Sequence, residues 1–222
     1  MNFGYQLDPG YIVTHLGELA SGLLWTIVLT GIGIAGGTLL GLVGGAIRSY
    51  KIPYLSPAIG VFVEAIRTTP FFVQIFFLYF GLPEIGITAS AFSVAVTALV
   101  VWGAAYNVEN FRAAIDAVPA GCHDAARALG LNGWRAFRLV VVPIAARIAM
   151  PSVTNTSVET LKNSALMLAI SFPELTDVAV KMVAVSFRVF EVFIVIGVTY
   201  LVLTAALTRA MREFERRLAW PT

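Results

Sequence analysis

Long apolar stretches are the feature that most constrains what this chain can fold into. Of its 222 residues, 58% are hydrophobic and only 13% are charged, and the mean hydropathy is +0.83. Soluble domains average roughly 45–50% apolar and about 25% charged residues. This chain therefore has too few charges to cover a water-facing surface, and its composition excludes a disordered or nucleic-acid-binding protein. We predict an all-α, multi-pass membrane protein.

Five stretches qualify as spans, since a membrane helix needs about 20 apolar residues. Hydropathy and helix-breaking residues place them at about 22–47, 56–80, 89–113, 152–172 and 189–210. Pro151 and Pro173 are expected to bracket the fourth span. Residues 1–21 are expected to form an extracytoplasmic leader, and residues 22–222 the transmembrane domain.

The basic residues are distributed unevenly between the two sides that these spans define. One side carries eleven, which are Arg48, Lys51, Arg112, Arg127, Arg135, Arg138, Arg147, Arg209, Arg212, Arg216 and Arg217. The other side carries only Lys181 and Arg188. Because the side richer in Lys and Arg is normally cytoplasmic, we expect the N-terminus outside and the C-terminus inside. That orientation requires an odd number of spans.

Four glycines of the first span, Gly33, Gly37, Gly41 and Gly45, follow one another at intervals of four residues. Small residues at this spacing form one ridge of a helix and let a second backbone approach closely. Intramolecular helix packing is the simpler interpretation, and a seam between two subunits is the alternative.

Residues that carry chemistry are scarce. Cys122 is the one cysteine and His15 and His123 are the two histidines, which does not favour a zinc site and excludes an internal disulfide. The sequence has no G-x-x-x-x-G-K-[ST] phosphate-binding loop. We expect no catalytic residue, metal site or cofactor here, and any ATP and Mg²⁺ to be bound by a separate subunit.

The longest connection, at about 114–147, contains a short helix signal. Pro119 is suited to begin a helix, Gly130 to end it, and Asn132 to cap a second turn. Leu129 and the small residues Ala125 and Ala126 make this helix too apolar to lie free in the cytosol. A groove on a partner protein would accommodate it, and the alternative is a helix resting on lipid headgroups.

This connection also resembles a known motif. Asp124-Ala125-Ala126, Gly130, Val140, Val142 and Pro143 match the E-A-A-x-x-x-G-x9-I-x-L-P signature of ABC importer permeases, with Asp for Glu and Val for Ile and Leu. Three further segments are similar to the polar amino-acid (His/Glu/Gln/Arg-type) permease subfamily. They are Glu64-Ala-Ile-Arg67-Thr-Thr-Pro70 with Gln74, Gly103-Ala-Ala-Tyr106-Asn-Val-Glu109-Asn-Phe-Arg112, and Leu161-Lys162-Asn163-Ser164-Ala165-Leu166.

The resemblance implies a five-helix permease of the type I ABC importer fold in the bacterial inner membrane. Its coupling helix would dock on an ATP-binding subunit through Asp124, Ala125, Ala126, Leu129, Gly130 and Pro143. The implied partners are two ATP-binding cassette subunits, a second copy or a homologous permease, a periplasmic solute-binding protein and membrane lipid, with no nucleic acid. The implied substrate is a polar amino acid, and another small solute is the alternative.

Ionisable residues inside spans cost about 2.5–3.5 kcal/mol on insertion scales, so they are candidates for function. Glu64 and Arg67 are three residues apart and are expected to neutralise each other, with Pro70 kinking the helix beyond them. We interpret these three residues as a structural or gating group. Glu109, near Tyr106 and Arg112, is expected to form a salt bridge that steadies the start of the coupling loop.

Glu159 and Lys162 lie in an unusually polar half of the fourth span. A zwitterionic substrate needs an anion for its ammonium group and a cation for its carboxylate, and this pair supplies both. The candidate cavity residues are Glu159, Lys162, Asn155, Asn163, Ser164, Gln74 and Tyr106. A salt bridge within the helix is an equally good interpretation of the charged pair.

Two other classes of membrane protein are alternatives. An intramembrane enzyme would need a Ser–His, paired-Asp or metal-ligand group at membrane depth, and the sequence places none there. A stand-alone channel or secondary carrier often has internal repeats, which this sequence lacks.

Overall fold

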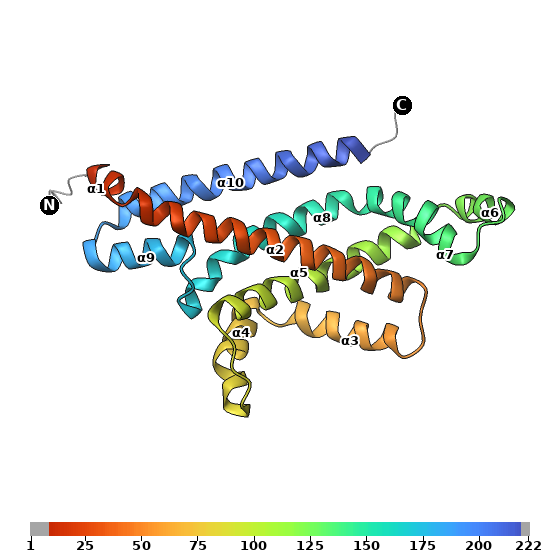
Figure 1. The fold of residues 1–222 in the computed structure, drawn as a ribbon, viewed down its shortest axis with the longest axis horizontal. Helices are drawn as coiled ribbons and strands as arrows, with labels where there is room; N and C mark the ends of the chain where they lie inside the picture. The colour runs from red at the N-terminus through yellow and green to blue at the C-terminus, as the bar shows by residue number, and fades with distance from the viewer. Residues whose placement is uncertain (1–8, 219–222) are drawn as a thin grey trace.

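The computed structural model describes residues 9–218, and this part of the chain is helical with no strand. Figure 1 shows long helices lying side by side, with a shorter arm projecting from them. The elements in chain order are α1 (Pro9–Thr14), α2 (Leu16–Ser49), α3 (Leu55–Thr68), α4 (Phe71–Phe76), a π-helical turn (Phe77–Gly81), a 3₁₀ turn (Leu82–Ile85), α5 (Ala91–Asp116), α6 (Ala120–Ala128), α7 (Gly133–Ala136), a second π-helical turn (Phe137–Val141), α8 (Val142–Ser164), a 3₁₀ segment (Ala165–Ile170), α9 (Leu175–Ser186) and α10 (Val189–Leu218).

The glycine ridge of α2 packs against α5, within the same chain. A Cβ atom at Gly41 would lie 2.3 Å from the Cβ of Asn107, and one at Gly37 would lie 3.0 Å from the backbone of Gly103. Contacts this short leave no room for any side chain, so the two backbones meet because the residues are glycines. The prediction of intramolecular packing is confirmed.

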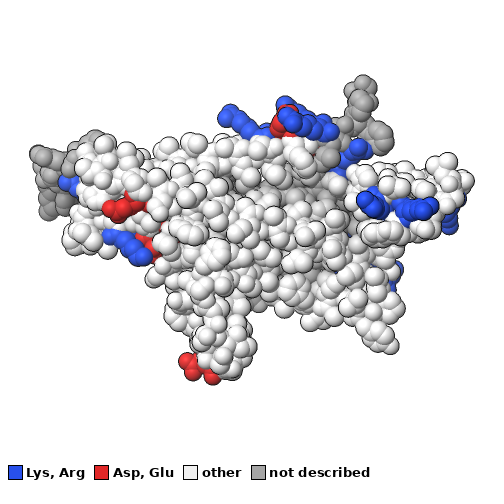
Figure 2. Space-filling model, in the orientation of Figure 1, with Lys and Arg blue, Asp and Glu red and all other residues white. Residues whose placement is uncertain are grey.

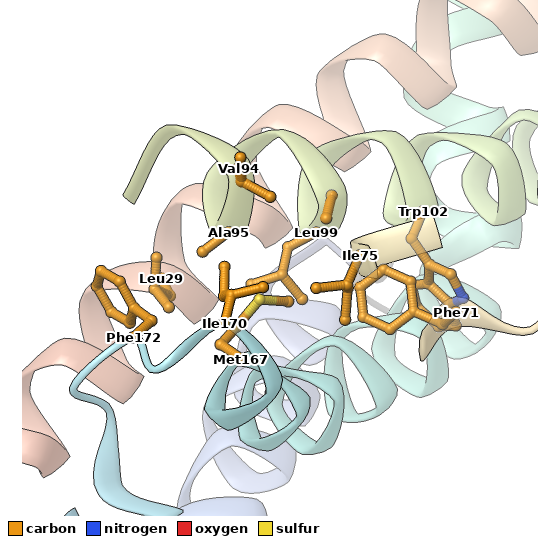
Figure 3. Close-up of a cluster of buried hydrophobic side chains, with 11 residues drawn as sticks. Leu29, Phe71, Ile75, Val94, Ala95, Leu99, Trp102, Met167, Ile170 and Phe172 are labelled. Carbon is orange, nitrogen blue, oxygen red and sulfur yellow. The ribbon is translucent and has the colours of Figure 1, made fainter. Parts of the chain in front are cut away.

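The largest group of buried hydrophobic residues joins four elements (Figure 3). It brings together Leu29 of α2, Ile75 of α4, Leu99 of α5 and Met167 of the 3₁₀ segment after α8, all of which are fully buried. Close van der Waals packing of this kind is what holds helices together inside a membrane. This cluster therefore fixes the root of α4 and the end of α8 to the central pair α2 and α5.

Within residues 9–218, four helical segments are long and apolar enough to cross a membrane, namely Leu16–Ser49, Ala91–Asp116, Gly133–Ile170 and Val189–Arg217. The second predicted span differs from the prediction, because it is broken into α3 and the arm that begins at α4, with a bend of 106° between them. The break lies at Thr69 and Pro70, where both backbones are extended. The helix is therefore interrupted at Pro70, as expected, but the bend is larger than the expected kink.

The fourth span also differs from the prediction. Its helix begins about ten residues earlier, at Val142, and Pro151 lies inside it rather than in front of it. The π-helical turn at Phe137–Val141 precedes Pro143, whose missing N–H is accommodated near the start of α8. Glu159 consequently lies about 25 Å along the helix from its first residue, Val142.

Charged side chains gather at particular places on the surface. Figure 2 shows a broad uncharged region across the helices, with Lys and Arg side chains over α6 and α7 and over the C-terminal half of α10. We call this end of the molecule, where α2 and α5 end and α8 begins, the arginine-rich end. The uncharged region fits the hydrocarbon layer of a membrane.

Candidate functional site

A polar cavity of about 420 Å³ lies between α8 and α10. Its walls are formed by Pro151, Thr154, Asn155, Val158, Glu159 and Lys162 of α8 and by Thr208, Arg212 and Glu215 of α10. We call it the α8–α10 cavity. Three of the predicted cavity residues, Asn155, Glu159 and Lys162, line it.

The charged pair of α8 is formed as an internal ion pair. The Nζ of Lys162 donates a 2.7 Å hydrogen bond to Oε1 of Glu159. Both side chains are about half exposed. Both interpretations of this pair therefore have geometric support, because an ion pair that borders an open cavity remains accessible to a ligand.

The polar residues of α8 divide between two faces of the helix. Thr156, Ser157 and Thr160 are buried, and their hydroxyls donate to backbone oxygens four residues earlier. Asn110 of α5 also donates a 3.0 Å hydrogen bond to the Thr156 hydroxyl. This face packs within the bundle, so only the other face, with Asn155, Glu159 and Lys162, is available to a solute.

Sequence reasoning missed the contribution of α10. Arg212 and Glu215 form no ion pair with any other residue in the range 9–218, and both face the α8–α10 cavity. The hydroxyl of Thr154, on the opposite wall, is buried and has no hydrogen-bond partner within the described chain. The signal in the sequence was only that Arg212 and Glu215 follow an apolar span at a helical spacing of three residues.

The other predicted cavity residues lie elsewhere. Gln74 donates hydrogen bonds to the carbonyl oxygens of Ile66 and Thr69, at 2.8 and 2.9 Å, and so bridges the break between α3 and α4. Tyr106 stacks on Trp102 with a centroid separation of 4.4 Å. Ser164 is buried and donates to the Leu161 oxygen, and neither Ser164 nor Asn163 lines the α8–α10 cavity.

The expected ion pair between Glu64 and Arg67 is not formed, and that prediction was wrong. The guanidinium of Arg67 instead lies 5.1 Å from the centroid of the Tyr106 ring on α5. A cation over an aromatic face is attracted by the ring quadrupole. Arg67 therefore ties the end of α3 to α5 rather than to its own helix.

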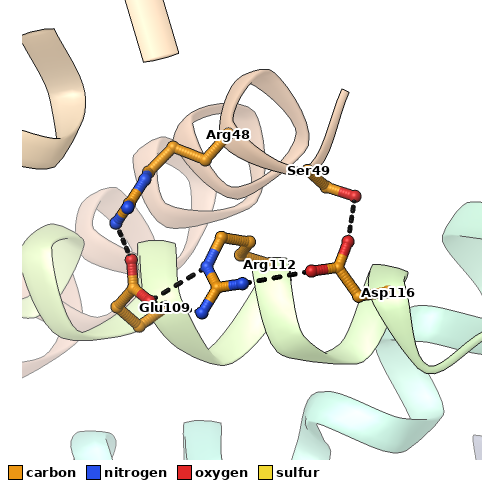
Figure 4. Close-up of polar contacts among 5 residues, drawn as sticks. All are labelled: Arg48, Ser49, Glu109, Arg112 and Asp116. Carbon is orange, nitrogen blue, oxygen red and sulfur yellow. Dashed lines mark hydrogen bonds and ion pairs between the residues drawn. The ribbon is translucent and has the colours of Figure 1, made fainter. Parts of the chain in front are cut away.

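Glu109 is the centre of an ion-pair network at the arginine-rich end (Figure 4). It accepts hydrogen bonds from Arg48 of α2 and, at 3.0 Å, from Arg112 of its own helix. Arg112 also contacts Asp116 at 3.1 Å, and Asp116 accepts a hydrogen bond from Ser49. The network joins the ends of α2 and α5 just before the connection to α6.

The short helix predicted in the connection is confirmed as α6. Pro119 is its N-cap, and Gly130 adopts a left-handed conformation with φ +71° just after it. The N–H groups of Gly130 and Leu131 donate to the oxygens of Arg127 and Ala126, which completes a Schellman motif.

The surface of this helical segment is largely open. Asp124 and Arg127 form an exposed ion pair at 3.1 Å, and Leu129 is 79% exposed. Asn132 caps α7 by accepting a 2.9 Å hydrogen bond from the N–H of Arg135, as predicted. Of the predicted coupling residues, only Ala126 is buried within the chain.

A buried carboxylate near the other end was not predicted. Glu174 is fully buried and caps α9, because its side chain accepts hydrogen bonds from the N–H groups of Thr176 and Asp177. Tyr200 of α10 donates a further 2.9 Å hydrogen bond to it, and Thr26 of α2 contributes a longer one. Burial raises the pKa of the Glu174 carboxyl, and these hydrogen bonds oppose the shift.

Comparison with known proteins places these features in a family. The model of the family described as "Binding-protein-dependent transport system inner membrane component" matches residues 33–220. The chain is 33% identical over 215 residues to the glutamine transport system permease protein of Escherichia coli (strain K12), covering 96% of this chain and 98% of that protein. It is 32% identical to the probable glutamine ABC transporter permease protein of Bacillus subtilis (strain 168), covering 93% of this chain and 96% of that protein.

Solved structures of similar proteins support the same family assignment. One chain of an amino acid ABC transporter crystallised with histidines is 34% identical and superimposes with a TM-score of 0.86, over 96% of this chain and 100% of that one. A chain of the MetNI methionine ABC transporter, in an inward-facing form, has a TM-score of 0.80 at 20% identity, over 93% and 99%, and shares the fold.

These findings confirm the all-α permease fold and the inner-membrane location, and they favour a pore subunit over the intramembrane enzyme and the stand-alone carrier. Such a subunit is not an enzyme. The chain belongs to the family of inner membrane components of binding-protein-dependent transport systems, the permease subunits of ABC importers.

Proposed function

We propose that this permease imports a polar amino acid, and that the α8–α10 cavity contributes to its path. The observation that carries the proposal is the set of charges around the cavity. Glu159 and Glu215 are anionic, and Lys162 and Arg212 are cationic. A balanced set of this kind suits a solute that carries one charge of each sign, such as an amino-acid zwitterion.

The geometry of the pair on α8 indicates how a zwitterion would be held. Its ammonium group would displace Lys162 from Glu159, and the freed Lys162 would then contact the carboxylate. Arg212 forms no ion pair within the described chain, so it is a second cation for that carboxylate.

The remaining parts of the transporter lie outside this chain. The proposed partners are two ATP-binding cassette subunits, which bind ATP and Mg²⁺, together with a second copy or a homologous permease and a periplasmic solute-binding protein. The distribution of Lys and Arg supports a cytoplasmic location for the arginine-rich end, with the N-terminus outside. Asp124, Ala125, Ala126, Leu129, Gly130 and Pro143 would form or support the surface that docks on the ATPase.

Transport would proceed by alternating access. Closure of the ATPase pair would move α6, and α8 would transmit that movement because it continues from α7 without a break. Docking must stabilise one state of the permease more than the other, since a contact of equal strength in both states shifts nothing. The ion-pair network around Glu109 would keep the ends of α2 and α5 together during this movement.

Glu159→Gln and Lys162→Gln test the cavity assignment. Each variant would be reconstituted in vesicles with the binding protein and the ATPase, and uptake of labelled polar amino acids would be measured. We expect a higher apparent KM or a loss of uptake in both. The control is Glu213→Gln, which removes an exposed carboxylate of α10 that pairs with Arg217 and does not line the cavity. Unchanged uptake and unchanged KM in both cavity variants would contradict the assignment.

A further inference from the structure

A second, apolar groove lies at the arginine-rich end, on a different side of the bundle from the α8–α10 cavity. Its volume is about 850 Å³. It runs between the last turns of α2 and the helical elbow of α7, the second π-helical turn and the start of α8. Its walls are Leu42, Val43, Ala46, Ile47, Tyr50, Ile52, Gly133, Trp134, Phe137, Arg138 and Val142. We call it the elbow groove.

The elbow groove extends from membrane depth to the membrane surface. Leu42 and Val43 belong to the apolar helix of α2, which ends at Ser49, and Val43 is exposed. Trp134 is 67% exposed at the other wall, at the beginning of the helical segment Gly133–Ile170. Trp is enriched where hydrocarbon meets the headgroups, so the groove opens toward both layers.

The walls of the elbow groove are held in place by aromatic contacts. The Tyr50 ring packs edge-on against Phe137, with centroids 5.6 Å apart, and Phe137 also contacts Trp134 at 5.9 Å. These contacts join α2 to the elbow without filling the space between them. The groove is therefore a feature of the packed fold.

One cation lines the elbow groove, and no carboxylate does. Arg138 is exposed and forms no ion pair with any residue that the structure describes. This sets it apart from Arg48, Arg112 and Arg127 at the same end, which are all paired with carboxylates. Arg135 and Lys51 add positive charge nearby in the sequence.

We propose that the elbow groove binds a phospholipid with an anionic headgroup, with an acyl chain along Leu42, Val43 and Ala46 and the phosphate at Arg138. Basic pockets between transmembrane helices are known to select anionic headgroups. An apolar solute would not use the guanidinium, and a zwitterionic lipid would gain less from it. Charge complementarity together with the apolar floor therefore selects an anionic lipid as the occupant.

Trp134 allows this to be tested directly, because lipids brominated on their acyl chains quench a nearby indole. The assembled transporter would be reconstituted in phosphatidylcholine containing either brominated phosphatidylglycerol or brominated phosphatidylcholine. The emission of the Trp134→Phe complex is subtracted to isolate the signal of Trp134. We expect the anionic lipid to quench at about fivefold lower mole fraction, the preference that one Arg near the surface provides.

Two variants assign the preference to the groove. Arg138→Gln should abolish the preference for the anionic lipid, and the control Arg135→Gln, on the same elbow but outside the groove lining, should retain it. Ala46→Phe should reduce quenching by both lipids because its ring fills the floor. Equal quenching by both headgroups would mean ordinary annular contact and would overturn the proposal. Absence of quenching by either lipid would also overturn it, since a protein partner would then cover the groove.

Discussion

The hydroxyl of Tyr200 on α10 donates a 2.9 Å hydrogen bond to the buried carboxylate of Glu174, 26 residues earlier in the chain. The same carboxylate caps α9 and accepts a weaker hydrogen bond from Thr26 of α2. A single side chain thus connects three helices at the end of the molecule opposite to the arginine-rich end. Each of its two carboxylate oxygens accepts at least one hydrogen bond, which makes its burial tolerable.

Removal of this carboxylate is expected to weaken the connection. Glu174→Ala leaves the N–H groups of Thr176 and Asp177 and the hydroxyl of Tyr200 without their acceptor, which should lower the free energy of unfolding by about 2–4 kcal/mol. Tyr200→Phe removes one hydroxyl, with its hydrogen bonds to Glu174 and Thr176, and should cost about 1–2 kcal/mol. Thermal unfolding in detergent measures both. Equal melting temperatures for Glu174→Ala and wild type would contradict this account.

The raised pKa of Glu174 predicts a pH dependence of stability. Because burial raises the pKa in the folded state, the folded protein holds its proton at a pH where the unfolded chain has already lost it. This contribution to stability is fully present below the pKa that the Glu174 carboxyl has in the unfolded chain. It is lost as the pH rises through the higher pKa that the same carboxyl has in the folded protein. We expect the melting temperature of wild type relative to Glu174→Gln to fall over that window. A difference that does not change with pH would argue against it.

The contact between α2 and α5 predicts that alanine substitutions at two glycines of α2 have different effects on stability. Gly41→Ala would place a methyl group 2.3 Å from the Cβ of Asn107, so the helices must separate, at a cost of about 1–3 kcal/mol. Gly31→Ala meets no atom within 4 Å and should leave stability unchanged or raise it. Unfolding in detergent compares the two variants. Similar stabilities would mean that the ridge is not a close contact.

The turn after α6 predicts a specific loss of ATPase binding. Gly130→Val forces a branched side chain into the left-handed region, which should unfold the Schellman motif and displace Leu129 while leaving membrane insertion intact. Copurification with the ATPase should fall. Gly86→Val is the matched control, because Gly86 also has a positive φ of 83° but lies on the arm that begins at α4. Undiminished copurification of Gly130→Val, with ATPase activity still stimulated by loaded binding protein, would overturn the docking assignment.

Sequence patterns were sufficient to predict the features that depend only on residues close together in the chain. The sequence predicted α6 and its terminal glycine because capping depends on neighbouring residues, and it predicted the ridge of α2 because the spacing of glycines is visible in the chain. It predicted a kink at Pro70 but not a bend as large as 106°, since hydropathy is the same for a straight helix and a broken one. It also missed α9, whose cap at Glu174 is completed by Tyr200 and Thr26 from other helices.

For the candidate site too, some features could be predicted from the sequence and others could not. Composition and charge placement determined by themselves that this is a membrane protein with one basic end, because transfer into a bilayer depends on residue type. Only the tertiary structure decided which polar residues face a cavity. The packing of α8 against α5 buries Thr156 and Thr160, whereas its other face meets Arg212 and Glu215 of α10 across an open space. Which side of a helix is covered depends on helices distant in sequence, and no local pattern contains that information.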